Sequence, residues 1–96
     1  MVDVKPQHSD IVKAILRHRL AGRTVRVFGS RATNRAKPAS DLDLVIMDGA
    51  PLTIRQRADL SFDFSASDLP YRVDIVEWSR LSEAFQKSIK VSDTIQ

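Results

Sequence analysis

Two aspartates near the middle of the chain have the spacing of a metal-binding pair. Asp41 and Asp43 flank Leu42, at the start of an apolar run that continues from Leu44 to Ile46. In an extended strand, residues i and i+2 point to the same face, with Cα atoms about 7 Å apart. Two carboxylates held in this way can converge on metal ions, and Mg²⁺ prefers such oxygen ligands together with substrate phosphates. The pattern therefore predicts a magnesium site at the start of this strand.

A glycine–serine pair upstream of these aspartates has the sequence of a phosphate-binding turn. The run Val25–Phe28 reads as a buried strand that ends at Gly29 and Ser30, and ten residues separate Ser30 from Asp41. Glycine lets the backbone come close to a phosphate group, and a helix that begins at Ser30 would point its free N–H groups there. Three basic side chains in the following loop could neutralise phosphate charge or be ordinary solvated residues: Arg31, Arg35 and Lys37.

A third acid, Asp74, lies inside another apolar run, between Val73 and Ile75. A charged side chain in such a strand is costly unless it is paired or binds a metal. If this strand lies beside that of Asp41 and Asp43, all three carboxylates share one face. Such a trio suits two Mg²⁺ ions about 3.5–4 Å apart, and Asp74 could also accept the proton of an attacking hydroxyl. We therefore expect Asp41, Asp43 and Asp74 to be both catalytic and metal-binding residues.

The composition is that of one small globular domain spanning residues 1–96. Hydrophobic residues make up 43% of the chain, which is enough for a modest core and too many for a disordered protein. Cysteine is absent, so disulfides and thiolate chemistry are excluded. No apolar run approaches the ~20 residues of a membrane span, and the start lacks a signal-peptide core, which favours a cytoplasmic protein. The net charge of +3 is mild and disfavours direct nucleic-acid binding.

Hydrophobic periodicity and turn residues predict helices and strands that alternate around one sheet. Apolar residues recur at the helical period before Gly22 and after Pro51, and Ser30 and Ser79 suit the N-cap position of a helix. Residues 91–96 are expected to be a loosely held tail. The order gives an α/β (α+β) domain with a small mixed sheet of three or four strands flanked by helices. Helices are predicted at 6–20, 30–35, 52–67 and 79–90, and strands at 24–28, 41–47 and 71–77.

Together these features resemble the signature of the nucleotidyltransferase superfamily. The resemblance is carried by Gly29-Ser30-Arg31-Ala32 and, ten residues after Ser30, by Asp41-Leu42-Asp43-Leu44, and it extends over nearly the whole chain. The short length is similar to that of the minimal (MNT) members, which are commonly antitoxins paired with a HEPN-domain ribonuclease toxin. The resemblance implies a polymerase beta-like fold. It departs at Asn34, where minimal members often have a glycine, and asparagine tolerates the left-handed conformation better than most residues.

Carried over by position, the resemblance implies a nucleotide-transfer site. ATP with two Mg²⁺ ions would bind at Gly29 and Ser30, with Arg31 and Arg35 beside its phosphates. An acceptor hydroxyl would attack the α-phosphate and pyrophosphate would leave. In this family the acceptor is often a tyrosine of the HEPN toxin, and the transferred AMP silences it. That expectation agrees with the size of the chain, because a domain this small leaves the acceptor to a partner in a hetero-oligomer.

Two alternatives stay open at the level of the sequence. The chain could be a non-catalytic antitoxin that neutralises its partner by occlusion and keeps only a vestigial nucleotide site. It could also be a nucleotidyltransferase for a small molecule such as an aminoglycoside, although those enzymes usually carry an extra helical domain. The complete set of acids favours a catalytic role over occlusion.

Overall fold

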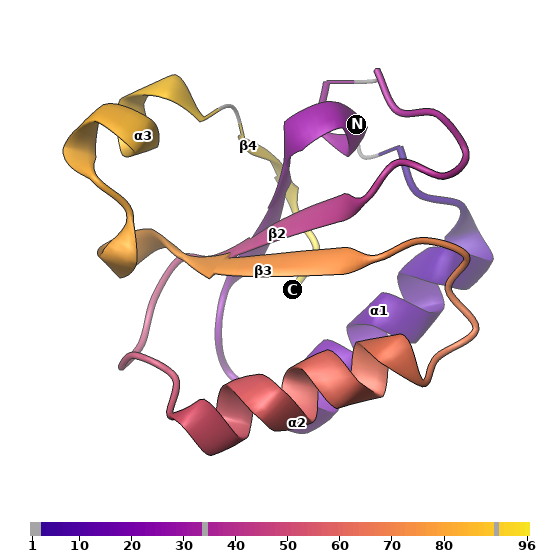
Figure 1. The fold of residues 1–96 in the computed structure, drawn as a ribbon, viewed down its shortest axis with the longest axis horizontal. Coiled ribbons are helices and arrows are strands. Elements are labelled where there is room, and N and C mark those ends of the chain that lie inside the picture. The colour runs from indigo at the N-terminus through magenta and orange to yellow at the C-terminus, as the bar shows by residue number, and fades with distance from the viewer. Residues whose placement is uncertain (1–2, 34, 90) are drawn as a thin grey trace.

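The computed structural model describes residues 3–33, 35–89 and 91–96 and contains one mixed sheet with two helices packed on the same face (Figure 1). Two short 3-10 turns, η1 and η2, interrupt the chain directly after strands. Among the described residues, no helix has the length and hydropathy needed to cross a membrane. The elements in chain order are α1 (Pro6–Arg19), β1 (Val25–Phe28), η1 (Gly29–Arg31), β2 (Leu42–Ile46), α2 (Ile54–Ser65), β3 (Val73–Glu77), η2 (Trp78–Arg80), α3 (Glu83–Ser88) and β4 (Val91–Thr94).

The sheet has the strand order β3-β2-β1-β4, in which β2 and β3 are parallel and β1 is antiparallel to both of its neighbours. A parallel pair needs a crossover connection, and α2 provides it between β2 and β3. The register of these strands sets Asp43 opposite Asp74 on one side and opposite Phe28 on the other. The predicted mixed sheet flanked by helices is therefore confirmed.

Side chains of β2 alternate between a helix-covered face and an open face. Leu42, Leu44 and Ile46 are at most 2% exposed and pack against α1 and α2, whereas Asp43 points the other way. The helix-covered face thus provides most of the apolar burial of this strand, whereas the other face buries Val45 and carries the charge of Asp43. The buried core also contains Val12, Leu16 and Leu20 from α1, Leu60 and Phe64 from α2, and Val25 and Val27 from β1.

Two helix predictions differ from the structure at their starts. The chain after β1 forms only the single turn η1, so Ser30 lies inside the turn and does not cap a helix that runs to Arg35. After β3, the turn η2 comes first, and Ser82 rather than Ser79 caps α3 by accepting the backbone N–H of Phe85. Lys90, the predicted end of this helix, lies outside the described residues. Asn34, which falls within the predicted helix 30–35, also lies outside them.

The C-terminal residues were predicted to be loose, and this is wrong, because they form a strand. β4 pairs with β1 in antiparallel fashion, and Ile95, only 7% exposed, joins the core. The Gln96 side chain donates to the carbonyl oxygens of Leu20 at 2.7 Å and Arg23 at 3.2 Å. The four residues of β4 have only one apolar member, Val91, and gave no alternating signal, so the strand depends on its partner β1 rather than on local propensity.

A buried ion cluster at the end of β3 had no signal in the sequence. Glu77 is 4% exposed and accepts the backbone N–H of Leu52 at 2.7 Å. Its carboxylate also pairs with the guanidinium of Arg57 from α2 and with that of Arg80 from η2, the latter at 3.1 Å. Two arginines and one backbone donor offset the desolvation of this carboxylate. The cluster fixes the crossover helix against the end of the strand that carries Asp74.

Burial of Ile95 should contribute measurably to stability. Replacement Ile95→Ala removes core methylenes and leaves a cavity, so we expect the free energy of unfolding to fall by about 2–4 kcal/mol. The matched control is Ile54→Ala, because Ile54 is 90% exposed and its truncation should change stability by less than about 0.5 kcal/mol. Urea denaturation measures both values. Equal effects of the two truncations would contradict the assignment of Ile95 to the core.

Candidate active site

The two central acids lie side by side on neighbouring strands. Parallel pairing of β2 with β3 places Asp43 and Asp74 opposite each other. The residues before and after each aspartate pack toward the core, so both aspartate side chains point to the opposite face. Asp43 is partly buried, whereas the side chain of Asp74 is 50% exposed. Asp74 therefore joins Asp43 on one face of the sheet, as the sequence predicted.

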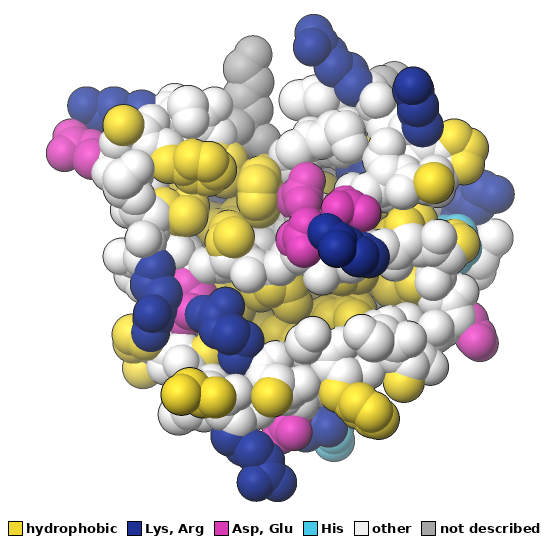
Figure 2. All heavy atoms as spheres, in the orientation of Figure 1, with side chains coloured by type: hydrophobic (Ala, Val, Ile, Leu, Met, Phe, Trp, Pro, Cys, Tyr) yellow, Lys and Arg dark blue, Asp and Glu magenta, His cyan; other side chains and the backbone are white. Residues whose placement is uncertain are grey.

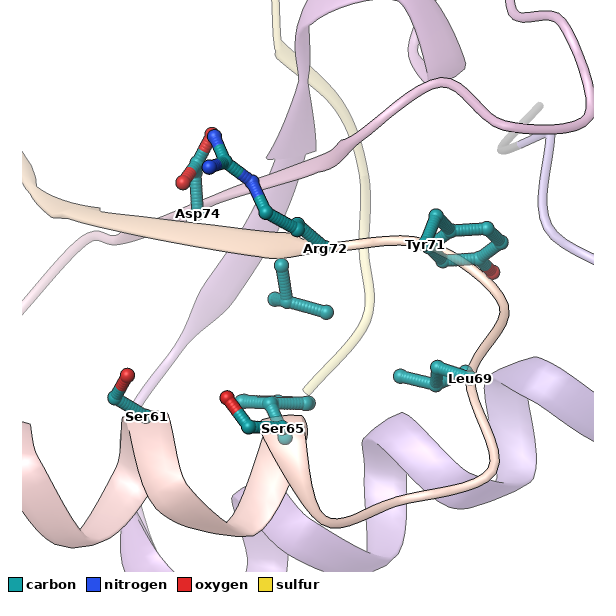
Figure 3. A pocket seen from close by; sticks show the side chains of 8 residues that line it. Ser61, Ser65, Leu69, Tyr71, Arg72 and Asp74 are labelled. Carbon is teal, nitrogen blue, oxygen red and sulfur yellow. The ribbon is translucent and has the colours of Figure 1, made fainter.

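Asp41 and Arg72 complete a compact charge cluster at the start of these strands. The guanidinium Nη2 of Arg72 lies 3.3 Å from Oδ2 of Asp41 and 3.8 Å from Oδ2 of Asp74. Figure 2 shows acidic side chains gathered around a basic one near the middle of the visible face, and Figure 3 shows Arg72 beside Asp74 on the rim of β3. A cation thus already lies between two of the three predicted acids. Sequence analysis assigned no role to Arg72.

The three carboxylates repel one another. Burial raises the pKa of Asp43 above its ordinary value, and the nearby charges of Asp74 and then Asp41 raise that pKa further. Neither ion pair of Arg72 involves Asp43, so Arg72 does not offset the repulsion on this carboxylate through an ion pair. A bound divalent cation would relieve the repulsion, because an opposite charge favours the ionised form.

The donor set fits Mg²⁺, although the carboxylates are not yet arranged as ligands. Among the residues that the structure describes, no three acidic or histidine side chains are placed to hold a metal ion as they stand. The guanidinium of Arg72 lies between Asp41 and Asp74, where a cation would have to enter. Hard oxygen ligands on one face are nevertheless what Mg²⁺ requires. We infer that Asp41, Asp43 and Asp74 could hold it once Arg72 has turned toward solvent.

Gly29 brings the turn after β1 against Asp43. Its φ of +76° is a conformation that L side chains rarely adopt, and an added Cβ would overlap Oδ2 of Asp43 and lie 3.1 Å from Cγ. The turn is closed by the N–H of Ala32, which donates to the Gly29 carbonyl at 3.1 Å. Ser30 is therefore held next to the acid cluster, where its predicted role at a phosphate group stays a prediction.

Arg31 ends the turn η1 and makes its contacts within the protein, while its predicted place beside phosphates stays a prediction. The residue is 5% exposed, and its guanidinium donates to backbone carbonyl oxygens of the N-terminal segment and of the loop before β2. It also lies 3.9 Å from the ring centroid of Tyr71, in a cation–π contact. Its N–H groups are occupied by protein acceptors, so Arg31 holds the N-terminal segment, the turn after β1 and the loop before β2 together. Its acceptors are the carbonyl oxygens of Asp3, Lys37, Pro38 and Ser40.

The other basic residues of this loop differ in position. Arg35 is exposed, and its backbone N–H donates to the Ser30 carbonyl at 2.9 Å. This bond keeps Arg35 near the turn, and its predicted contact with a nucleotide stays a prediction. Lys37 is exposed too, and it lines a cavity of about 310 Å³ together with Arg31 and Tyr71. Lys37 therefore lies beside the residues that support the site.

Replacement of Gly29 should disturb the site more than replacement of another glycine in the same conformation. Gly22 has a φ of +81° but nothing within 4 Å of an added Cβ, so Gly22→Ala should cost about 1–2 kcal/mol of strain alone. Gly29→Ala adds the overlap with Asp43 and should cost a further ~1–3 kcal/mol. Thermal or urea unfolding of both variants measures the difference. If the two variants were equally stable, Gly29 would not be held against Asp43.

The raised pKa of Asp43 predicts how stability depends on pH. Because the folded state holds this proton more tightly than the unfolded state, stability falls as pH rises from the ordinary aspartate pKa of about 3.9 through the raised value. Asp43→Asn removes that loss, so without divalent cations the variant should melt higher than the parent chain near neutral pH and equal it at low pH. Asp10→Asn, at an exposed position of α1, is the control. Melting curves from pH 3 to 8 would contradict the assignment if Asp43→Asn lowered the neutral melting temperature.

Comparison with known proteins gives the chain its family. Residues 10–95 match the family described as "Polymerase beta, Nucleotidyltransferase". The chain is 44% identical over 89 residues to the "Probable protein adenylyltransferase MntA" of Haemophilus influenzae strain Rd, an alignment that covers 93% of this chain and 78% of that protein. The match includes the part of the chain that carries the glycine–serine turn and the acids.

Two solved structures share the fold. The first is described as "Crystal structure of the toxin-antitoxin with AMP-PNP", with a TM-score of 0.67 and 23% identity, and the match covers 86% of this chain and 70% of that one. The second is a mutant of the toxin–antitoxin MntA-HpeT, with a TM-score of 0.65 and 19% identity over 92% of this chain and 71% of that one. The resemblance that the sequence suggested is confirmed, and the chain belongs to the polymerase beta nucleotidyltransferase family.

Proposed function

We propose that this chain transfers AMP from ATP to a hydroxyl group of a partner toxin and thereby neutralises it. The observation that carries this proposal is the position of Asp43, which lies between Asp74 on β3 and the glycine turn at Gly29. Acids that can hold Mg²⁺ and a turn that can approach a phosphate are thus in contact. The name of the relative from Haemophilus influenzae, a probable protein adenylyltransferase, supports the same activity.

The proposed partner is a HEPN-domain ribonuclease, and the proposed acceptor is one of its tyrosines. The similar solved structures are described as toxin–antitoxin assemblies, which supports a hetero-oligomer with a toxin. Among the described residues, the hydrophobic core holds together one sheet and two helices. We therefore expect the acceptor to belong to a separate protein.

A cavity next to Gly29 offers room for the nucleotide. It has a volume of about 290 Å³ and is lined by Gly29 itself, by Phe28 and Thr33 around the turn, and by Phe85 and Ile89 at α3. Phe85 is 45% exposed, and an exposed ring suits stacking with a base. A nucleotide with its phosphates at Gly29 would therefore reach the acids of β2 and β3. The AMP-PNP of one similar complex supports nucleotide binding in this fold.

The arrangement suggests how the chain's own residues would act. Asp41, Asp43 and Asp74 would hold Mg²⁺, which when bound would polarise the α-phosphate and lower the pKa of the acceptor hydroxyl. Asp74, whose side chain is more exposed than that of Asp41, would take up the proton as the hydroxyl oxygen attacks. The new bond joins that oxygen to the α-phosphorus, the bond from the α-phosphorus to the bridging oxygen breaks, and pyrophosphate carries away the electron pair.

Loss of the acids on β2 should abolish transfer. The double variant Asp41→Asn and Asp43→Asn removes two of three proposed ligands, so we expect AMP transfer to fall by about 100-fold or more. The test incubates the chain, ATP, Mg²⁺ and the proposed HEPN-domain partner, and follows the intact mass of that partner. Asp10→Asn is the control and should transfer AMP at the parental rate.

Other outcomes would identify the alternatives. A HEPN protein that stays unmodified in a stable complex, and is inhibited there equally by the double variant, would show neutralisation by occlusion. Transfer of label from ATP to an aminoglycoside without any partner would show a small-molecule enzyme. Either result would overturn the proposed activity.

A further inference from the structure

A second cavity lies on the side of Asp74 that faces away from Gly29. It has a volume of about 420 Å³ and runs between α2 and β3 (Figure 3). Its floor contains Phe64 and Val73, and serine hydroxyl groups line its wall on α2. Because the strand order puts β3 at the margin of the sheet, this groove is open along its length. The residues labelled in Figure 3 are Ser61, Ser65, Leu69, Tyr71, Arg72 and Asp74.

The margin of β3 also offers backbone hydrogen-bonding groups. Among the described residues β3 pairs only with β2, and the Arg72 carbonyl points to β2, since it accepts the Leu42 N–H at 2.9 Å. Backbone groups alternate along a strand, so those of Val73 and Ile75 point outward. An unpaired strand of this kind is a template for an added strand. The groove therefore joins a free sheet edge to the acid cluster.

We infer that the groove between α2 and β3 binds the acceptor as an extended peptide segment of the partner, added as a fifth strand beside β3. This inference rests on the proposed transfer to a protein hydroxyl and names where that hydroxyl enters. An added strand lies about 4.8 Å from β3, and its side chains alternate between the two faces. One set enters the groove beside Ser61 and Ser65. The other set lies on the face of Asp74, within reach of a tyrosine hydroxyl.

The positions of the two cavities favour a nucleotide at Gly29 and an acceptor at Asp74 over the opposite placement. The cavity at Gly29 and the groove at Asp74 lie on opposite sides of Asp43 along the sheet. An attacking oxygen and a leaving pyrophosphate must also lie on opposite sides of the α-phosphorus. With the nucleotide phosphates at Gly29, the side of Asp74 is left for the acceptor. The polar wall and open edge fit a main chain better than a compact apolar ligand.

A single cysteine can locate the partner without any need for catalysis. The parent chain has no cysteine, so Ser65→Cys provides a unique thiol for a maleimide–benzophenone probe in the groove. Illumination of the complex with the proposed HEPN-domain partner should crosslink the two chains, and peptide mapping should place the link in one extended segment of that partner. Ala14→Cys on the exposed side of α1 is the control. A crosslink from Ala14 but none from Ser65 would overturn the inference.

A bulky charge in the groove should separate acceptor binding from nucleotide binding. Ser61 is exposed, so Ser61→Arg should fold, keep the melting shift given by Mg²⁺ and AMP-PNP, and lose AMP transfer to the HEPN protein by about tenfold or more. Ala14→Arg is the matched control and should keep both properties. Phe62→Arg tests the outer surface of α2, where Phe62 is 70% exposed.

Each result then has a definite meaning. Loss of transfer in Ser61→Arg with transfer kept in Phe62→Arg supports the groove, whereas the opposite pattern moves docking to the outer surface of α2 and overturns it. If the parent chain transfers no AMP but the Ser65 probe crosslinks, the proposed enzymatic function fails and the docking site stands. Absence of any binding between the chain and the HEPN protein would overturn both.

Discussion

The parallel pairing of β2 with β3 is the constraint on which the rest of the site depends, because it forces two like charges into neighbouring positions. Asp43 and Asp74 are direct register partners, and a register shifted by one residue would move one of them to the other face. Their repulsion is an unfavourable term of the apo fold. It is offset by the apolar burial on the reverse side of the same strands and, in part, by Arg72. The fold thus holds like charges close together at a cost that the rest of the structure offsets.

Stability and chemistry are divided between the two faces of the sheet. The face under α1 and α2 is closed by leucine, valine and isoleucine side chains, while the other carries the acids. Arg31 and Glu77 support the open face from buried positions at its two ends. Arg31 ties the loop before β2 to the turn after β1, and Glu77 fixes the end of β3 to α2. Both are buried charges satisfied by several partners.

Much of this arrangement could be predicted from the sequence, and the failures have physical reasons. The period-2 position of Asp41 and Asp43 in an apolar run, together with the lone acid Asp74 in another, predicted a shared face if the two strands were neighbours, and the structure pairs them. The burial of Arg31 was missed because its acceptors are carbonyl oxygens distant in sequence, and such groups leave no trace in residue type. β4 was missed for a similar reason, since its pairing with β1 comes from tertiary context rather than from propensity.

The contact between Gly29 and Asp43 limits how this sequence can drift. Any side chain at Gly29 would meet the carboxylate, and relief within the pair requires the Asp43 side chain to turn away or a smaller residue to replace it. Either change would displace or delete the central acid of the cluster. Neither position can therefore change first without loss, so a lineage that keeps this chemistry has no stepwise route away from the pair.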